Sequence, residues 1–416
     1  MYNTGNKNYN QALAILSTLF FIWGLITVLN FMLVEKFMII FSLSSYESYF
    51  LNVAFFGAYL LVSYPSGKLI DLIGYKTGMV MGILIGAFGC FLFCPAAAYQ
   101  SYGLLLLALF VLGSGITLLQ VSANPYVALL GPHGLGASKL TLVQAFNSLG
   151  TFLAPLFAAG FFMKIAGLTK NSLATMKPEE LREALIAYVQ MPYLILGVAF
   201  ILLALLIGFS EIPVLDTADA QPSAKEEVNN SSGPYILKFP HVWMGALAIF
   251  LYVGIEVAIG QYLVSIYERN ASSDFFIKFY WGAAMIGRFI GAGLLRVLSP
   301  RKGLAIFASS AVFLLLFYII FRESDAGLWA LSLIGLSNSI LFPCIFTMGI
   351  DGMGKYAEES SALLNMAIVG GAIIPFLFSS VPFYLAFLLP VASYAFIIYY
   401  GLKGSRHRSI NVVNGL

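Results

Sequence analysis

The chain consists of long apolar stretches that follow one another from Ala12 to Tyr400, separated by charges, Gly/Pro clusters and short polar turns. A helix needs about 20 mostly apolar residues to cross the hydrocarbon core of a bilayer. Dividing the stretches at their polar interruptions predicts an all-α membrane protein with twelve transmembrane helices. The predicted ranges are 11–34, 47–66, 77–98, 102–130, 139–164, 187–209, 242–267, 276–298, 303–321, 327–350, 360–380 and 383–401.

The most polar stretch of the sequence, DTADAQPSAKEEVNNSSG, lies between the sixth and the seventh predicted helices. Its composition is typical of a flexible linker, so we expect it to join two halves of the protein. The predicted parts are an N-terminal six-helix half at 1–210, a cytoplasmic linker at 211–240, a C-terminal six-helix half at 241–401 and a cytoplasmic tail at 402–416.

An internal repeat favours two similar halves. NPYVALLG aligns with FPCIFTMG, NSLGTFLAP aligns with AIVGGAIIP, and GKLIDLIGYK aligns with GRFIGAGLLR, at offsets that differ by only two residues. The equivalent pairs are Pro125 and Pro343, Gly131 and Gly349, Gly150 and Gly370, Pro155 and Pro375, and Gly67 and Gly287. Two six-helix halves joined by a linker are the layout of an alternating-access transporter, whose substrate site lies between the halves near the bilayer midplane.

Composition narrows the class of function. Hydrophobic residues make up 60% of the chain and charged residues only 10%, whereas soluble domains carry about 25% charged residues. The net charge of +3 provides no broad basic surface, so nucleic acid is not an expected partner. The three cysteines and three histidines form no CxxC motif or histidine pair, and we therefore expect no metal, no cofactor and no enzymatic activity.

The distribution of Lys and Arg predicts the orientation in the membrane. If the N-terminus is cytoplasmic, most of the 22 Lys and Arg residues lie in cytoplasmic segments. We therefore expect a multi-pass plasma-membrane protein with both termini in the cytoplasm. Apart from membrane lipid, this architecture needs no partner, so a monomer is expected.

Polar side chains at bilayer depth are candidates for substrate binding, because they cost free energy unless they are paired or used. Carboxamides can both donate and accept hydrogen bonds, which suits the hydroxyls of a neutral sugar, and aromatic rings suit its apolar faces. The candidate substrate-binding residues are Trp23, Asn30, Gln120, Asn124, Gln144, Asn147, Tyr252, Gln261, Asn338 and Asn365. Each amide taken alone is as well explained by a hydrogen bond between helices, but the set as a whole favours binding.

Three charged residues are candidates for coupling and gating. Glu256 lies near the middle of a predicted span, where an ionised carboxylate would cost about 2.5 to 3.5 kcal/mol, so it is the candidate ion-coupling residue, with a structural hydrogen bond as the alternative. Arg288 is a gating candidate, expected near the cytoplasmic end of the eighth span and paired with an acid such as Asp351 or Glu359. Asp71 is the candidate gate, because a carboxylate there could cap a helix of the other half and separate from it as the halves move.

Several segments resemble a known family. GKLIDLIGYKTG resembles the loop between the second and third helices of the major facilitator superfamily. FFIWGLITVLN, SANPYVALLGP, VQAFNSLG, YVGIEVAIGQYLV and SALLNMAIVGGAIIP are similar to the fucose/galactose/glucose proton symporter family within it, over residues 20–375. The resemblance implies the fold of that superfamily and a bacterial inner-membrane importer of a neutral hexose or 6-deoxyhexose, such as glucose, galactose or fucose.

The chain departs from the fucose transporters of that family at two acids. Phe31 stands where they have an aspartate after the Leu-Asn of the first helix, and Gln120 stands where they have a glutamate before the Asn-Pro of the fourth. Asn147 is kept, and Glu256 agrees with the glucose/galactose-type members. The resemblance therefore implies sugar recognition, while coupling to H⁺, coupling to Na⁺ and uncoupled facilitation stay open as alternatives.

Overall fold

A computed structural model describes residues 6–132, 134–157, 177–213, 215, 235–269 and 274–406. These residues are helical, with short 3-10 and π turns and no strand among them, which confirms the all-α class. The chain divides into two compact units. The first unit is Met1–Ala123 with Lys139–Pro213, and the second is Asn124–Ser138 with Val214–Leu416. The predicted linker falls largely outside the described residues, as do residues 407–416 of the predicted tail.

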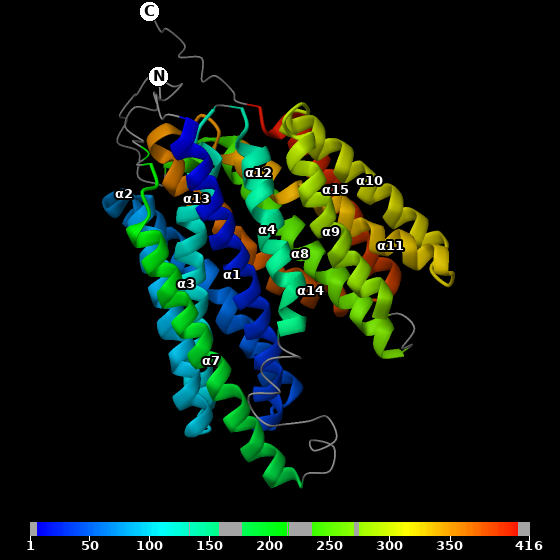
Figure 1. The fold of residues 1–416 in the computed structure, drawn as a ribbon. Helices are drawn as coiled ribbons and strands as arrows, with labels where there is room; N and C mark the ends of the chain where they lie inside the picture. Colours follow the sequence, from blue (N-terminus) through cyan, green and yellow to red (C-terminus); the bar gives the residue numbers. More distant parts are fainter. Residues whose placement is uncertain are drawn as a thin grey trace, which may run out of the picture. The chain divides into compact units, whose positions relative to one another are not determined.

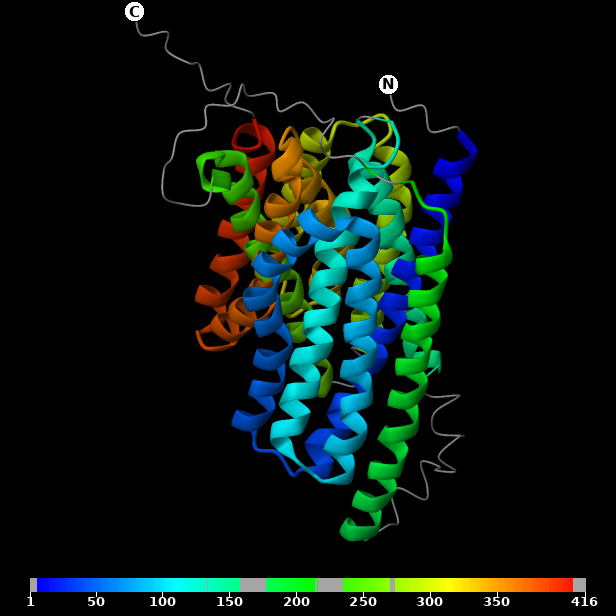
Figure 2. The same cartoon turned by 90° about the vertical axis from the view of Figure 1, so that its left-hand side faces the viewer.

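The first unit is built from long apolar helices (Figure 1). They are α1 (Asn6–Ile40), α2 (Ser45–Ala98), α3 (Tyr102–Leu129), α4 (Gly136–Phe157) and α7 (Pro178–Phe209), of which α3 and α4 extend into the second unit at one end. Helix α7 packs against both α2 and α1, and Figure 2 shows α2, α3 and α7 side by side.

The second unit is arranged around one central helix, α8 (Pro240–Arg269). Several helices pack against α8, among them α9, α12, α13, α14 and α15. The remaining elements are η3 (Tyr235–Lys238), α9 (Asp274–Leu294), α10 (Pro300–Ile320), α11 (Asp325–Asn338), α12 (Leu341–Ile350), η5 (Gly354–Tyr356), α13 (Ala357–Met366), η6 (Ala367–Val369), α14 (Gly370–Ser379), α15 (Phe383–Tyr399) and η7 (Tyr400–Gly404).

The described helices agree with the expected membrane crossings. Nine helical segments in the described ranges are long and apolar enough to cross a membrane. One of them, Phe50–Ala98, has 49 residues, which suffices for two crossings of about 20 residues each. With α4 and α9, every one of the twelve predicted spans overlaps a described helix.

The second and third predicted spans both lie in α2. Between them, Gly74 is the one residue whose backbone is not helical. Helix α2 is kinked at this point, where Gly74 has φ 78° and ψ 163°. This region of backbone space is essentially restricted to glycine. The change of direction in α2 therefore depends on the missing side chain at this position.

Gly74→Ala is expected to destabilise the protein by about 1–3 kcal/mol, because alanine must adopt a strained backbone conformation there. Thermal unfolding of the protein in detergent measures the effect. Gly57→Ala is the matched control, since Gly57 lies in the same helix and a Cβ there would meet open space. Equal losses of melting temperature in the two variants would contradict this account of the kink.

The sequence repeat corresponds to equivalent helix crossings in the two units. A Cβ at Gly150 of α4 would overlap the carbonyl oxygen of Phe21 in α1. A Cβ at Gly370 of α14 would likewise overlap the carbonyl oxygen of Phe250 in α8. Gly150 and Gly370 are the pair that the repeat aligns, so in each unit the same repeat position allows one helix to approach the first helix of that half.

Candidate functional site

The predicted amides of the first unit are held by different partners. Asn30 Oδ1 accepts a hydrogen bond of 2.9 Å from the Tyr193 hydroxyl, which connects α1 to α7. Gln120 Nε2 donates at 2.6 Å to the Tyr59 hydroxyl, which connects α3 to α2. These two buried pairs fix the positions of both amides within the helix bundle.

Asn147 and Trp23 lie at the crossing of α4 and α1. Asn147 Nδ2 donates at 3.0 Å to the carbonyl oxygen of Phe20. Trp23 is buried and packs edge-on against the ring of Phe20, with 5.1 Å between ring centroids. This crossing is the one that the glycines of both helices make close, so Asn147 bonds directly to the backbone of α1.

Two polar atoms on α1 lack a hydrogen-bond partner among the described residues. They are Thr27 Oγ1 and Asn30 Nδ2, which lie three residues apart and are both buried. Residues at this spacing lie on the same side of a helix. Since buried polar atoms are normally satisfied, these two atoms are candidates for binding a hydroxyl group of a substrate.

A third such atom belongs to Asn124, in the part of α3 that clusters with the second unit. Asn124 Nδ2 donates at 3.4 Å to Asn365 Oδ1, and both residues are fully buried. Asn365 Nδ2 in turn donates at 2.8 Å to the carbonyl oxygen of Ser361. Asn124 Oδ1 has no hydrogen-bond partner among the described residues, so this amide also has capacity for a ligand.

The remaining predicted residues differ in how far their side chains are exposed. Gln144 is buried in α4, whereas Gln261 is exposed on α8. Asp71 is exposed in α2, three residues before the kink at Gly74. The side chain of Phe31 lies outside the described residues. Gln261 is thus the one exposed member of the predicted binding set.

The second unit contains a buried network centred on Glu256. The Tyr252 hydroxyl donates at 2.8 Å to Glu256 Oε1, and Arg288 Nη2 lies 3.8 Å from the same oxygen. The Tyr280 hydroxyl donates at 3.1 Å to the carbonyl oxygen of Glu256. The side chains of Glu256 and Arg288 are only 12% and 15% exposed. Glu256 is therefore an acid with a cationic neighbour, an ion pair that the sequence did not anticipate for Arg288.

Asn338 is the second centre of this network. Its Nδ2 donates at 3.1 Å to the Tyr280 hydroxyl, its Oδ1 accepts at 2.7 Å from Tyr394, and its carbonyl oxygen accepts at 3.2 Å from Tyr252. Three tyrosines from α8, α9 and α15 thus converge on one residue at the end of α11. Asn338 therefore connects α8, α9 and α15 to the end of α11 through its amide and carbonyl groups.

The carboxyl group of Glu256 gives this network acid–base chemistry, next to the positive charge of Arg288. Glu256 can exist as a carboxylate or as a carboxylic acid, and both forms can accept the hydrogen bond from Tyr252. In the described ranges no three His, Cys, Asp or Glu side chains come together to hold a metal.

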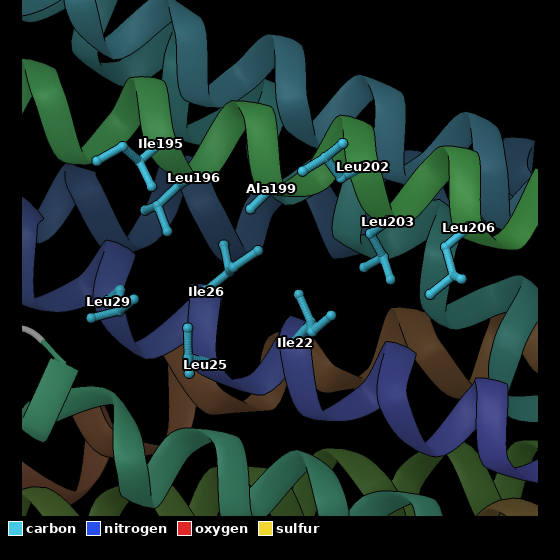
Figure 3. Close-up of a pocket in the computed structure, with 10 residues that line it drawn as sticks. All are labelled: Ile22, Leu25, Ile26, Leu29, Ile195, Leu196, Ala199, Leu202, Leu203 and Leu206. Carbon is cyan, nitrogen blue, oxygen red and sulfur yellow. The ribbon is translucent and has the colours of Figure 1, made fainter.

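A cavity of about 400 Å³ lies between α1 and α7 in the first unit (Figure 3). Its lining residues are Ile22, Leu25, Ile26, Leu29, Ile195, Leu196, Ala199, Leu202, Leu203 and Leu206. Sugar sites need polar groups that fix the orientation of the ligand. This lining offers aliphatic side chains alone, so the cavity does not correspond to the predicted sugar site.

Four tyrosines of these networks were missed at the level of sequence: Tyr59, Tyr193, Tyr280 and Tyr394. All four are buried within helices, and each forms a hydrogen bond with a predicted asparagine or glutamine. A tyrosine hydroxyl is also a polar group at bilayer depth, which was the signal available. With 23 tyrosines in the chain, that signal alone does not select these four.

The chain matches known proteins over nearly its whole length. The sequence model described as Major Facilitator Superfamily matches residues 13–376. The chain is 41% identical to a "Glucose/galactose transporter" of Brucella abortus, over 97% of this chain and 96% of that protein. It is 33% identical to the "L-fucose-proton symporter" of Escherichia coli, over 89% of this chain and 86% of that protein. A crystal structure of the transporter FucP in the outward conformation resembles it with a TM-score of 0.82 and 30% identity, covering 96% of this chain and 100% of FucP.

Proposed function

Since the chain belongs to the major facilitator superfamily, we propose that it imports a neutral monosaccharide by alternating access, coupled to the entry of a proton. The protein is a membrane transporter and not an enzyme. The observation that carries the proposal is the full-length similarity to a transporter named for glucose and galactose. The expected substrates are therefore hexoses or 6-deoxyhexoses such as glucose, galactose and fucose.

The buried amides support recognition of a neutral sugar. Asn30 Nδ2 is a free donor and Asn124 Oδ1 a free acceptor within the described part of the chain. A sugar hydroxyl can both donate and accept, so each atom could be satisfied by one hydroxyl group. The remaining candidates, among them Gln120, Gln144 and Asn147, would provide further hydrogen-bonding groups for the sugar.

Asn30→Ala and Asn124→Ala are each expected to weaken sugar binding about tenfold, since one lost hydrogen bond of about 1.4 kcal/mol corresponds to that factor. Isothermal titration of the purified protein with the transported sugar measures the change. Gln190→Ala is the matched control, because Gln190 is a part-buried amide whose Nε2 donates to the Cys94 carbonyl oxygen. Wild-type affinity in both asparagine variants would contradict their proposed role in sugar binding.

Glu256 is the proposed coupling residue. A titratable group must exist for a proton gradient to drive sugar uptake, and this chain has Phe31 and Gln120 at the two family acid positions. The similarity to a proton symporter favours H⁺ as the coupled ion, with Na⁺ as the variant. Asp71, which is exposed near the kink of α2, is the proposed gating residue. For Arg288 we propose the role of ion-pair partner of Glu256 instead of a gate.

An uncoupled sugar facilitator is the alternative function. The observation that favours it is the ion pair of Glu256 with Arg288. A fixed positive neighbour can satisfy a buried carboxylate permanently, so that no proton needs to bind during transport. In that case the pair would be structural.

We place the protein in the bacterial inner membrane, with both termini in the cytoplasm, and as a monomer surrounded by lipid. The bias of Lys and Arg toward the predicted cytoplasmic segments supports this orientation. Cysteine labelling of single-cysteine variants at the two termini, in intact cells and in inverted vesicles, tests it.

Counterflow in proteoliposomes tests the function itself. Vesicles loaded with an unlabelled sugar are diluted into traces of the same labelled sugar, for a panel of glucose, galactose, fucose and mannose. Transient uptake of at least one neutral sugar is expected, and an imposed inward proton gradient should then produce net accumulation. No counterflow with any sugar of the panel would overturn the proposed substrate class, and counterflow without accumulation would favour the facilitator.

A further inference from the structure

The Tyr252 hydroxyl lies between two acceptors that belong to different parts of the second unit. It is 2.8 Å from Glu256 Oε1 within α8 and 3.2 Å from the carbonyl oxygen of Asn338 at the end of α11. The residue is buried. A phenol hydroxyl carries one proton, so it can donate fully to only one of the two oxygens at a time.

The charge on Glu256 decides between the two acceptors. A hydrogen bond to an ionised carboxylate is roughly twice as strong as one between neutral groups. With Glu256 ionised, the hydroxyl proton is held at Oε1, and with Glu256 protonated, the Asn338 carbonyl oxygen becomes the competitive acceptor. From one position, the Tyr252 hydroxyl therefore has an acceptor within reach for each protonation state of the acid.

The other ionisable groups around Glu256 come from two neighbouring helices. Arg288 and Tyr280 belong to α9, and Tyr394 belongs to α15. Arg288 provides the counter-charge for the ionised acid, and the Tyr280 hydroxyl is bonded to the main chain of Glu256. Tyr252, on α8 itself, joins the carboxyl group to the carbonyl oxygen of Asn338.

Asn338 marks a break in the helical path of the tenth predicted span. Helix α11 ends at Asn338, and α12 begins at Leu341. The Asn338 side chain is fixed at both ends by Tyr280 and Tyr394, which do not contact the Glu256 carboxyl group through these bonds. Its carbonyl oxygen, by contrast, accepts from Tyr252. The hydrogen bond from Tyr252 to the Asn338 carbonyl oxygen is thus the bond at the break that responds to the charge of Glu256.

We propose that Tyr252 is a positioning residue that transmits the protonation state of Glu256 to the break between α11 and α12. The inference rests on the proposed coupled transport and extends it. The transported proton binds Glu256 from the solution on one side and leaves to the solution on the other. Tyr252 keeps its own proton throughout and donates it to one acceptor or the other. The hydrogen bond to the Asn338 carbonyl oxygen, which stabilises the segment between α11 and α12, is thereby strengthened or weakened.

Tyr252→Phe tests the proposal because it removes the hydroxyl and keeps the ring. Proton-driven accumulation of sugar in proteoliposomes should fall at least tenfold, toward equal concentrations on both sides, while counterflow continues at a reduced rate. Tyr394→Phe is the matched control: it also removes a hydroxyl bonded to Asn338, but one that makes no bond to Glu256. Its accumulation ratio is expected to stay within twofold of wild type.

The outcomes separate this inference from the proposed function. A wild-type protein that performs counterflow without proton-driven accumulation would overturn proton coupling, and the inference with it. Accumulation by Tyr252→Phe at the wild-type ratio would overturn the inference alone. Equal losses of accumulation in Tyr252→Phe and Tyr394→Phe would also overturn it, because they would show a network that serves stability only.

Hydrogen–deuterium exchange provides a test that does not need Tyr252→Phe to fold. Peptides covering residues 335–345 are compared at pH 5.5 and pH 8 in the wild type and in Glu256→Gln, after correction for the intrinsic pH dependence of exchange. We expect protection to change with pH in the wild type and to be constant in the variant. The same pH dependence in both proteins, or none in the wild type, would overturn the proposal.

Discussion

Glu256→Gln is expected to abolish proton-driven accumulation of sugar while exchange of sugar across the membrane continues. Glutamine has nearly the same shape and can still accept the hydrogen bond from Tyr252, but it cannot bind and release a proton. One proton crossing a potential of 100 mV supplies about 2.3 kcal/mol, which corresponds to roughly fifty-fold accumulation of a neutral solute. The variant should lose this entire factor, as measured by steady-state uptake of labelled sugar into energised proteoliposomes.

The control for this variant is Glu323→Gln. Glu323 also forms an ion pair with an arginine, 3.4 Å from Arg322, but its side chain is 87% exposed. Removing that charge should leave the accumulation ratio unchanged, because exposed pairs contribute little. Accumulation that persists in Glu256→Gln would assign the coupling to another group.

Gly150→Ala and Gly370→Ala are each expected to destabilise the protein by about 2 kcal/mol or more, because the added methyl group forces two packed helices apart. In both cases the new Cβ would overlap a carbonyl oxygen of the first helix in the same half. Thermal unfolding in detergent and the fraction of protein that elutes as a single species measure the loss.

Two glycines surrounded by open space are the matched controls for these variants. A Cβ at Gly103 in α3 or at Gly282 in α9 would meet no atom within 4 Å. Alanine is the better helix former by roughly 0.5–1 kcal/mol, so the control variants should be as stable as the wild type or more so. Stable Gly150→Ala and Gly370→Ala variants would show that the two crossings are looser than described.

The sequence was sufficient to predict the helical class, the approximate ranges of the described helices and the equivalent glycines of the two halves. These features depend on apolar runs of fixed length and on glycines at close crossings, both of which are visible in one chain. The boundary inside α2 was less accurate. The predicted spans leave a loop at 67–76, but the structure is helical there except at Gly74. One backbone torsion suffices to redirect a helix, and composition does not reveal it.

The candidate site residues were predicted from their side-chain type. Which of them form hydrogen bonds within the protein depends on tertiary contacts. Asn338 was expected to bind substrate, but three tyrosines use its amide and carbonyl groups. Gln261 is exposed because it lies five residues beyond Glu256, about 140° around the helix. The partners of Arg288 and Asn338 are far apart in sequence, so no local pattern could have identified them.

The central claim is that this transporter couples the entry of a neutral sugar to the entry of a cation. Recording the current of reconstituted protein on a solid-supported membrane, during rapid jumps of a neutral sugar, tests it most directly. The account predicts a sustained inward current that grows with the inward proton gradient, is independent of sodium and disappears in Glu256→Gln. Sugar counterflow in the same vesicles with no sugar-evoked current would contradict coupling and would make the protein a facilitator.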